Sequence, residues 1–205
     1  MALATQATCS GAPPRFTRPF DVPASLDTAA RLALLGEVIA DGCAAPAVRV
    51  FARKVYADAC AVSAQHRALP FGTALAVAAL VRVQGLPFAP DPPGRDVYQP
   101  LAVTVERGGD CEDLVALYVG VLRAVVAMHP HAEGVEARAA WFEVPGAEED
   151  HVVAVVRESS AAPWRWAECS VVGAWLGEHP RDAVRRLSHP RGFLLALGEH
   201  AKGVR

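Results

Sequence analysis

The sequence predicts an α+β fold in which N-terminal helices, and a later helix that begins at Cys111, pack on an antiparallel β-sheet. Three observations predict this class. Apolar residues recur at helical spacing before residue 85, an almost wholly apolar run follows Cys111, and three runs rich in Val, Trp and Phe follow residue 134. Helical spacing places apolar side chains on one helix face, whereas β-branched and aromatic runs between turn residues favour strands.

Length and composition indicate a single globular domain. The chain has 205 residues, of which 52% are hydrophobic and 20% charged, which is enough apolar content for a core. A net charge of -2 supplies no cationic field for nucleic acid or anionic lipid, so we expect neither as a partner. The most apolar stretch, residues 73–81, is far shorter than the ~20 residues that span a bilayer. The first 20 residues do not resemble a secretory signal, so we expect a cytoplasmic protein.

The chain divides into an arm, a core and an extension. Residues 1–25 contain four prolines among Gly, Ser and Thr, which predicts an extended or mobile arm. Residues 26–175 hold the predicted helices and strands and form the predicted main domain. Residues 176–205 are expected to add short helices and loops to that same domain.

Four helices are predicted from apolar spacing and capping residues. Ser25 or Asp27 can cap the first, and the fourth has so little polar surface that we expect it to be buried on most sides. Five prolines and two glycines make residues 85–100 a loop. The helices are expected over residues 27–41, 47–62, 72–84 and 111–128.

Three strands are predicted after the fourth helix. Turn residues Pro145-Gly146 and Ser159-Ser160 separate them at hairpin distances, so an antiparallel meander is the economical arrangement. We expect the tryptophans of these runs, and Trp175 beyond them, to contribute mainly to the core. The strands are expected over residues 135–144, 151–157 and 164–172.

The five cysteines form an odd, scattered set without a C-x-x-C pair. This pattern favours neither a disulfide framework nor a zinc ribbon, and it leaves at least one thiol free. Cys43, Cys60 and Cys169 are interpreted as small buried residues.

Cys111 differs from the other cysteines because of the string Gly108-Gly109-Asp110-Cys111-Glu112-Asp113-Leu114. Asp110 suits the helix N-cap, which puts the thiol in the first turn, where the helix dipole favours thiolate. The two glycines allow a backbone or a substrate to approach closely. Three carboxylates beside the thiol oppose ionisation, so a cation must offset them.

His151 is the candidate for that cation and for a general base, and Glu168 is the candidate that orients it. In a hairpin centred on Ser159 and Ser160, facing residues have numbers that sum to 319, and His151 then faces Glu168. We expect the protonated imidazole to keep Cys111 as thiolate. A slip of one residue would move one side chain to the other face.

These motifs resemble the transglutaminase-like superfamily, particularly its bacterial and phage members. The resemblance covers roughly residues 45–173 and rests on G-G-D-C-E-D-L, H-V-V-A-V-V, W-R-W-A-E-C and the earlier D-V-Y-Q-P. It implies a papain-like fold with a catalytic triad carried onto Cys111, His151 and Glu168. The family usually has Asp at the third position, so Glu168 is a departure.

The resemblance implies acyl transfer through a thioester on Cys111. We expect a peptidase or amidase that cleaves a peptide or isopeptide bond in a protein or peptide substrate. Alternatives are a protein transglutaminase, transfer from a small acyl thioester, and a non-catalytic binding or assembly module. The oxyanion would be held by the Cys111 N–H and by Gln99 or Gln84.

A calcium site is a further candidate. Asp110, Glu112 and Asp113 supply the hard oxygen ligands that calcium prefers, as in the related calcium-dependent periplasmic proteases that the D-C-E-D string resembles. Three acids fall short of the usual six to eight ligands, and helix capping accounts for two of them. No other cofactor is expected.

Overall fold

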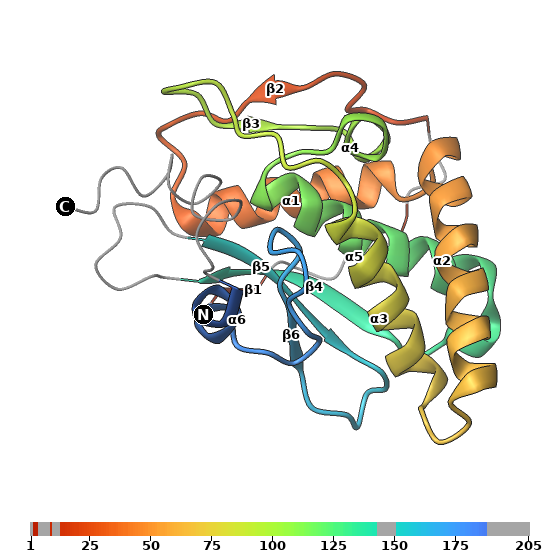
Figure 1. Cartoon of the computed structure of the whole chain (residues 1–205). Coiled ribbons are helices and arrows are strands. Elements are labelled where there is room, and N and C mark those ends of the chain that lie inside the picture. Colours follow the sequence, from red (N-terminus) through yellow and green to blue (C-terminus); the bar gives the residue numbers. More distant parts are fainter. Residues whose placement is uncertain (1, 4–8, 10–12, 143–150, 188–205) are drawn as a thin grey trace.

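The computed structural model describes residues 2–3, 9, 13–142 and 151–187, and these form a mixed α+β structure (Figure 1). A four-stranded antiparallel sheet has the order β1-β4-β5-β6, and β2 and β3 form a separate antiparallel pair. The strands are β1 (Ala2–Leu3), β2 (Phe20–Asp21), β3 (Val97–Tyr98), β4 (Glu136–Phe142), β5 (His151–Arg157) and β6 (Arg165–Ala167). The helices are α1 (Thr28–Gly42), α2 (Pro46–Gln65), α3 (Phe71–Gln84), α4 (Leu101–Arg107), α5 (Cys111–Met128), the 3-10 turn η1 (Pro130–Ala132) and α6 (Pro180–Leu187).

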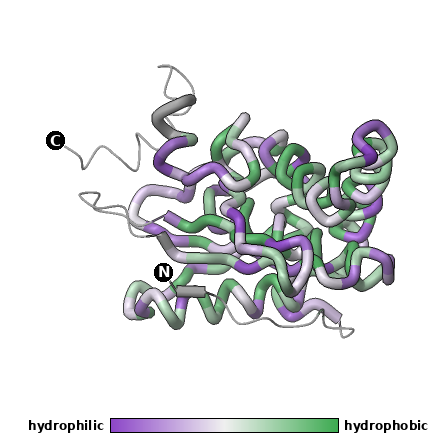
Figure 2. Tube along the Cα trace, turned by 90° about the horizontal axis from the view of Figure 1, so that it is seen from below, coloured by the Kyte–Doolittle hydropathy of each residue, from purple (hydrophilic) through white to green (hydrophobic). Residues whose placement is uncertain are grey.

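Helix α5 is the centre of the core. It packs on β4 and β5 and also contacts α1, α2, α3 and α4, while α2 and α3 lie side by side (Figure 1). Nearly every residue from Asp113 to Val125 is buried, as its apolar sequence predicts. Figure 2 shows the hydrophobic stretches gathered inside and hydrophilic ones at the outer turns.

The predicted helices are confirmed, and the α-helix α4 and the 3-10 turn η1 were not predicted. Helix α1 is capped by Asp27, whose Oδ1 accepts the Ala30 N–H at 2.8 Å. Helix α2 begins at Pro46 because proline suits the first helical turn, where the missing N–H has no intrahelical role. Helix α4 is short and follows Pro100 directly; seven residues carry too little periodicity to be recognised from sequence.

The antiparallel meander is also confirmed, but the predicted register of its second hairpin is wrong by two residues. The turn is centred on Ser160 and Ala161, because the Ala162 N–H donates to the Ser159 carbonyl at 3.1 Å. Facing residues in β5 and β6 are therefore Ala154 with Ala167 and Val155 with Trp166. A shift of two residues keeps every side chain on its predicted face. Strand β6 is shorter than predicted, and the Pro145-Gly146 turn lies outside the described residues.

The described parts of the N-terminal arm are extended and held to the body. Strand β1 pairs with the edge of β4, with Ala2 opposite Trp141. Further along, the Arg15 and Phe16 N–H groups donate to the two carboxylate oxygens of Asp41 at 2.7 and 2.8 Å. The arm therefore contacts both the sheet and α1.

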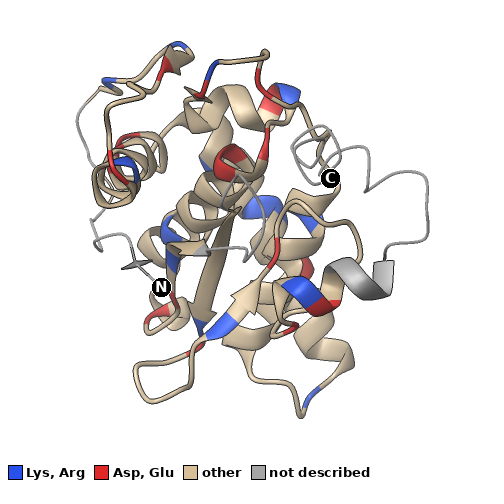
Figure 3. Ribbon diagram, turned by 90° about the vertical axis from the view of Figure 1, so that its left-hand side faces the viewer, with Lys and Arg blue, Asp and Glu red and all other residues tan. Residues whose placement is uncertain are grey.

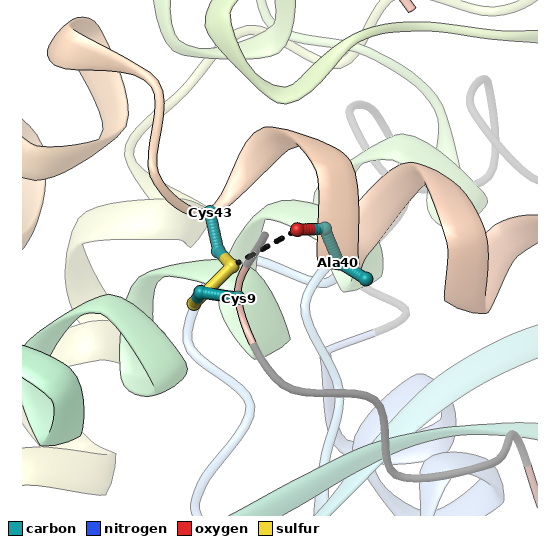
Figure 4. Close-up of a disulfide and its surroundings, with 3 residues drawn as sticks. All are labelled: Cys9, Ala40 and Cys43. Atoms are coloured by element: carbon teal, nitrogen blue, oxygen red, sulfur yellow. Dashed lines mark hydrogen bonds between the residues drawn. A yellow bond between two sulfur atoms is a disulfide. The ribbon is translucent and has the colours of Figure 1, made fainter. Parts of the chain in front are cut away.

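A disulfide joins Cys9 of the arm to Cys43 at the end of α1, with the Cα atoms 5.6 Å apart (Figure 4). Cys43 is buried as expected, but the expectation that the cysteines form no disulfide framework is wrong for this pair. The pairing depends on the arm returning along α1 across 34 positions, which no local spacing signals. Cys60 is exposed, against expectation, whereas Cys169 is buried as expected; these two and Cys111 are free thiols.

Three features of the structure bear on expectations about membranes, charge and the core. No helix in the described part of the chain is long and apolar enough to cross a membrane. Figure 3 shows basic and acidic residues interspersed rather than gathered by sign. Trp175, which was expected in the core, is instead 64% exposed.

Candidate active site

Cys111 is the first residue of α5, as predicted. The Asp110 carboxylate caps the helix by accepting the Asp113 N–H at 3.3 Å, and Asp110 is only 5% exposed. The half-buried thiol therefore lies beside the first-turn amides, which have no intrahelical partners.

The two glycines before the helix admit a neighbouring backbone, the loop that follows α3. Gly108 has a φ of +78°, and a Cβ there would lie 1.8 Å from the Pro87 carbonyl oxygen. The Gly109 N–H donates to that oxygen at 3.2 Å, and the Gly109 carbonyl accepts the Ala89 N–H at 2.9 Å. The loop thus fixes the direction in which the chain enters α5.

The thiol itself is held as a proton donor. Its Sγ donates to Glu112 Oε2 at 2.7 Å. Burial, together with the charges of Glu112 and Asp110, raises the pKa of Cys111 well above its ordinary value, and the Val152 N–H opposes this only in part. This shift argues against the expected thiolate, because burial and two carboxylates disfavour the charged form of the thiol.

His151 and Glu168 form a close pair. His151 Nε2 lies 2.7 Å from Glu168 Oε2, and the Glu168 side chain is fully buried. The other oxygen, Oε1, accepts the Ser170 N–H at 3.0 Å and the Ser170 hydroxyl at 2.6 Å. The prediction that the two residues lie directly opposite each other is wrong, since the register differs by two residues and Glu168 follows the end of β6. The contact still exists because a shift of two residues leaves both side chains on the same face of the sheet.

Each member of the pair shifts the pKa of the other. Burial would lower the pKa of His151, but the Glu168 carboxylate outweighs it and the net shift is upward. Burial would raise the pKa of Glu168, but His151 and the Ser170 donors outweigh it and the net shift is downward. Both groups therefore favour their charged forms.

Val152, the chain neighbour of His151, lies beside the thiol. The Val152 N–H interacts with Cys111, and Val152 directly follows His151 at the start of β5. The Glu112 carboxylate acts on both the thiol and the imidazole, raising the pKa of each. The thiol's hydrogen bond goes to Glu112 rather than to the imidazole.

Gln99 lies at the same helix end. Its N–H donates to Asp113 Oδ1 at 2.8 Å, and its side-chain Nε2 donates to Asp113 Oδ2 at 2.5 Å. Burial raises the pKa of Asp113 to about 7, although the two Gln99 donors oppose the shift. One N–H of the Gln99 amide is left for another acceptor.

Gln84, the other predicted oxyanion donor, has a different role. Its Nε2 donates to the carbonyls of Glu168 at 2.9 Å and Ala174 at 3.1 Å, and its Oε1 accepts the Gly173 N–H at 3.2 Å. Since a primary amide has two N–H donors, none is left for a substrate. Gln84 instead holds the segment that carries Glu168 in place by these three hydrogen bonds.

The three acids proposed for calcium face different partners. Asp110 caps the helix, Glu112 accepts the thiol and Asp113 accepts Gln99. Across the described ranges no group of three or more His, Cys, Asp or Glu side chains is arranged to hold a metal ion. Burial and the neighbouring carboxylates raise the pKa of Asp110 well above its ordinary value, which indicates repulsion that its protonation would relieve.

Sequence reasoning missed the roles of Ser170, Gln84 and Glu112. Ser170 stands two positions after Glu168, a spacing from which a short side chain can donate back to a carboxylate, so it was findable once Glu168 was chosen. The Gln84 contacts span more than 80 positions and have no local signal.

Comparison of the chain with protein-family models, with curated proteins and with solved structures finds no match.

Proposed function

We propose that this protein is a cysteine-dependent acyl-transfer enzyme, in which Cys111 is the nucleophile, His151 the general base and Glu168 the group that orients it. The observation that carries the proposal is the 2.7 Å contact between His151 and a fully buried Glu168, one residue from the N–H that interacts with the Cys111 thiol. A buried carboxylate that holds an imidazole beside a nucleophile is the arrangement by which triads fix the tautomer.

The hydrogen bonds indicate which ring nitrogen of His151 takes the thiol proton. Glu168 occupies Nε2 of His151, so Nδ1 is the ring nitrogen that remains for the thiol proton. Cys111 Sγ attacks the substrate carbonyl as its proton passes to Nδ1, and the C–N bond then breaks as that proton moves to the departing amine. Water then adds to the thioester carbonyl, the C–S bond breaks, the acyl group leaves as a carboxylic acid, and the sulfur takes back a proton to restore the thiol.

The raised pKa of Cys111 favours general-base activation over a preformed ion pair. Attack therefore begins from the thiol, and the proton leaves during the reaction. Glu112 holds the resting thiol and must release it when the substrate carbonyl arrives.

Two donors are available for the oxyanion. The Cys111 N–H is among the first-turn amides without an intrahelical partner, and the Gln99 amide has one N–H left at the same helix end. Asp113 anchors Gln99 by two hydrogen bonds, which would limit the movement of this donor during turnover.

We propose a papain-like, transglutaminase-like arrangement for the fold. Its support is the resemblance of the motifs, together with a buried helix that begins at the nucleophile and packs on antiparallel strands that carry the base. Within this class we favour a peptidase or amidase, because water needs no dedicated site to reach the thioester. A protein or peptide is the proposed substrate.

The test is an acyl-enzyme assay with p-nitrophenyl acetate and the full chain. We expect a burst of p-nitrophenolate and an acetyl adduct that peptide mapping locates on Cys111. Cys111→Ser should abolish the burst and His151→Asn should reduce it by about 10²-fold or more, within the range that general-base catalysis contributes. Cys60→Ser is the matched control, since Cys60 is an exposed free thiol, and it should leave the burst unchanged.

The same assay separates the alternatives. Addition of a primary amine such as cadaverine would give an amide product if the enzyme is a transglutaminase, and free acetate if it is a hydrolase. Equal bursts from the wild type and Cys111→Ser would refute catalysis at this thiol and favour a binding or assembly module.

A further inference from the structure

Glu168, the group proposed to orient His151, has a separate partner for each of its carboxylate oxygens. Oε2 lies 2.7 Å from His151 Nε2. Oε1 accepts the Ser170 hydroxyl at 2.6 Å and the Ser170 N–H at 3.0 Å. Because an ionised carboxylate only accepts hydrogen bonds, Nε2 must carry the proton of the neutral ring. The arrangement therefore leaves Nδ1 of the neutral ring without a proton.

Glu168 depends on these side-chain contacts because the sheet does not hold it. The last paired residue of β6 is Ala167, opposite Ala154, so Glu168 lies beyond the strand. Its main chain is fixed from α3 instead, where Gln84 Nε2 donates to the Glu168 carbonyl at 2.9 Å. That contact leaves the side-chain torsions free, and the last torsion of a glutamate has only broad preferences. The direction of the carboxylate therefore depends on Ser170 and His151.

Full burial makes the Ser170 hydroxyl important. The Glu168 side chain is 0% exposed, so bulk water does not replace a partner that it loses. A buried carboxylate remains ionised only where hydrogen bonds or charges compensate for the lost hydration. Burial raises the pKa of Glu168, but His151 and the two Ser170 donors outweigh it and the net shift is downward. Without the hydroxyl, Oε1 would keep only the backbone donor, and the carboxylate would be free to turn.

We propose that Ser170 is a positioning residue of this site: it fixes the Glu168 carboxylate so that His151 keeps its proton on Nε2 and leaves Nδ1 free for the Cys111 proton. The catalytic consequence rests on the proposed acyl-transfer function. The arrangement of the three side chains does not rest on it, and it can be measured without turnover.

The same geometry requires a glutamate rather than an aspartate at position 168. Glu168 reaches Ser170 with one oxygen and His151 with the other. An aspartate is shorter by one methylene group, which is about 1.5 Å of reach. A hydrogen bond lengthened by that amount is lost. In Glu168→Asp the shorter carboxylate should stay with Ser170, which lies two positions away in the same segment, and should lose His151.

The test measures the tautomer of His151 from the ¹⁵N chemical shifts of its ring nitrogens in the full chain, above the pH at which the ring titrates. His151→Asn assigns the signals. We expect the wild type and Ser170→Thr, which keeps the hydroxyl, to show a ring protonated on Nε2. Ser170→Ala and Glu168→Asp should show a mixture of both tautomers. Ser159→Ala, which removes an exposed hydroxyl in the turn before β6, is the matched control and should resemble the wild type.

A single Nε2–H tautomer in Ser170→Ala would overturn the proposal even if the melting temperature falls, because a merely structural role would lower stability alone. Wild-type tautomers in Glu168→Asp would overturn the requirement for glutamate.

The p-nitrophenyl acetate burst tests the catalytic consequence. Ser170→Ala and Glu168→Asp should each slow the burst by about tenfold or more, as expected for the loss of one hydrogen bond to a charged group. Ser170→Thr should restore the rate. A burst that needs Cys111 but is unchanged in Ser170→Ala would overturn the positioning role and leave acyl transfer intact. A burst that does not need Cys111 would instead refute the proposed function, and the tautomer measurement would still decide the role of Ser170.

Discussion

Replacing Glu168 by Gln tests the triad at its most buried member. The substitution keeps the volume, and the new amide oxygen can still accept both Ser170 donors, so the lost interaction is the charge opposite His151. A charge-assisted hydrogen bond exceeds a neutral one by about 1–2 kcal/mol. For a domain of this size a loss of about 2 kcal/mol lowers the melting temperature by roughly 4–8 °C.

The pH dependence of that loss follows from the two pKa shifts. The pKa of His151 is raised, so its contribution is present below the ordinary histidine value and is lost as the pH rises through the raised value. The pKa of Glu168 is lowered, so its contribution is present above the ordinary carboxyl value and is lost as the pH falls through the lowered value. The destabilisation should therefore be larger at about pH 6 than at about pH 9, since ordinary histidine titrates near 6.5.

Activity should fall much further than stability. The Gln amide can donate to Nε2 of His151, which places the ring proton on Nδ1 and blocks that nitrogen as a base. A wrong tautomer of this kind costs about 10³–10⁴-fold in rate. The assays are thermal unfolding at both pH values and the p-nitrophenyl acetate burst, with Glu133→Gln, at an exposed glutamate, as control. Retention of more than a tenth of the burst, or equal destabilisation at both pH values, would refute the proposed role of Glu168.

Three further predictions concern the surroundings of the site. Cys43→Ser should lower the free energy of unfolding by about 3–4 kcal/mol, measured in urea without reductant, because the disulfide closes a loop of 34 positions. An unchanged midpoint of the urea unfolding curve would show that the disulfide adds no constraint. Gly109→Ala should lower the free energy of unfolding by about 1–3 kcal/mol, because the added Cβ would lie 2.4 Å from Asp113 Cβ. We expect the added methyl group to displace the Asp113 side chain from Gln99, and a crystal structure with Gln99 still bonded to Asp113 would contradict this. In the free protein at pH 7, iodoacetamide should modify exposed Cys60 before Cys111, and the Cys111 rate should climb with pH, as its raised pKa requires; peptide mapping that finds Cys111 first would show that the imidazolium dominates.

Local signals were sufficient for the elements that form the site. Asp110 before an apolar run predicts the helix start at Cys111, and the glycine pair predicts a close backbone approach, which the Pro87–Ala89 loop makes. The pairing of His151 with Glu168 was predicted through a wrong register, and it survived because side-chain direction in a strand alternates with a period of two.

Long-range contacts and desolvation were beyond sequence reasoning. The Cys9–Cys43 disulfide and the Gln84 hydrogen bonds join segments whose proximity depends on the whole fold. The raised pKa of Cys111 depends on how much water reaches the thiol and on the rotamer of Glu112, and neither can be predicted from the sequence.

The Cys9–Cys43 disulfide also sets opposing demands on the cellular environment and on the assay buffer. The proposed chemistry needs Cys111 reduced, whereas the tether of the arm needs two sulfurs oxidised in the same chain. A disulfide persists in oxidising compartments and is reduced in most cytosols, so a reducing compartment would open the Cys9–Cys43 tether. Dithiothreitol, the usual protectant of thiol enzymes, would likewise open it, and rates measured with and without this reagent would then belong to two covalent forms of the protein.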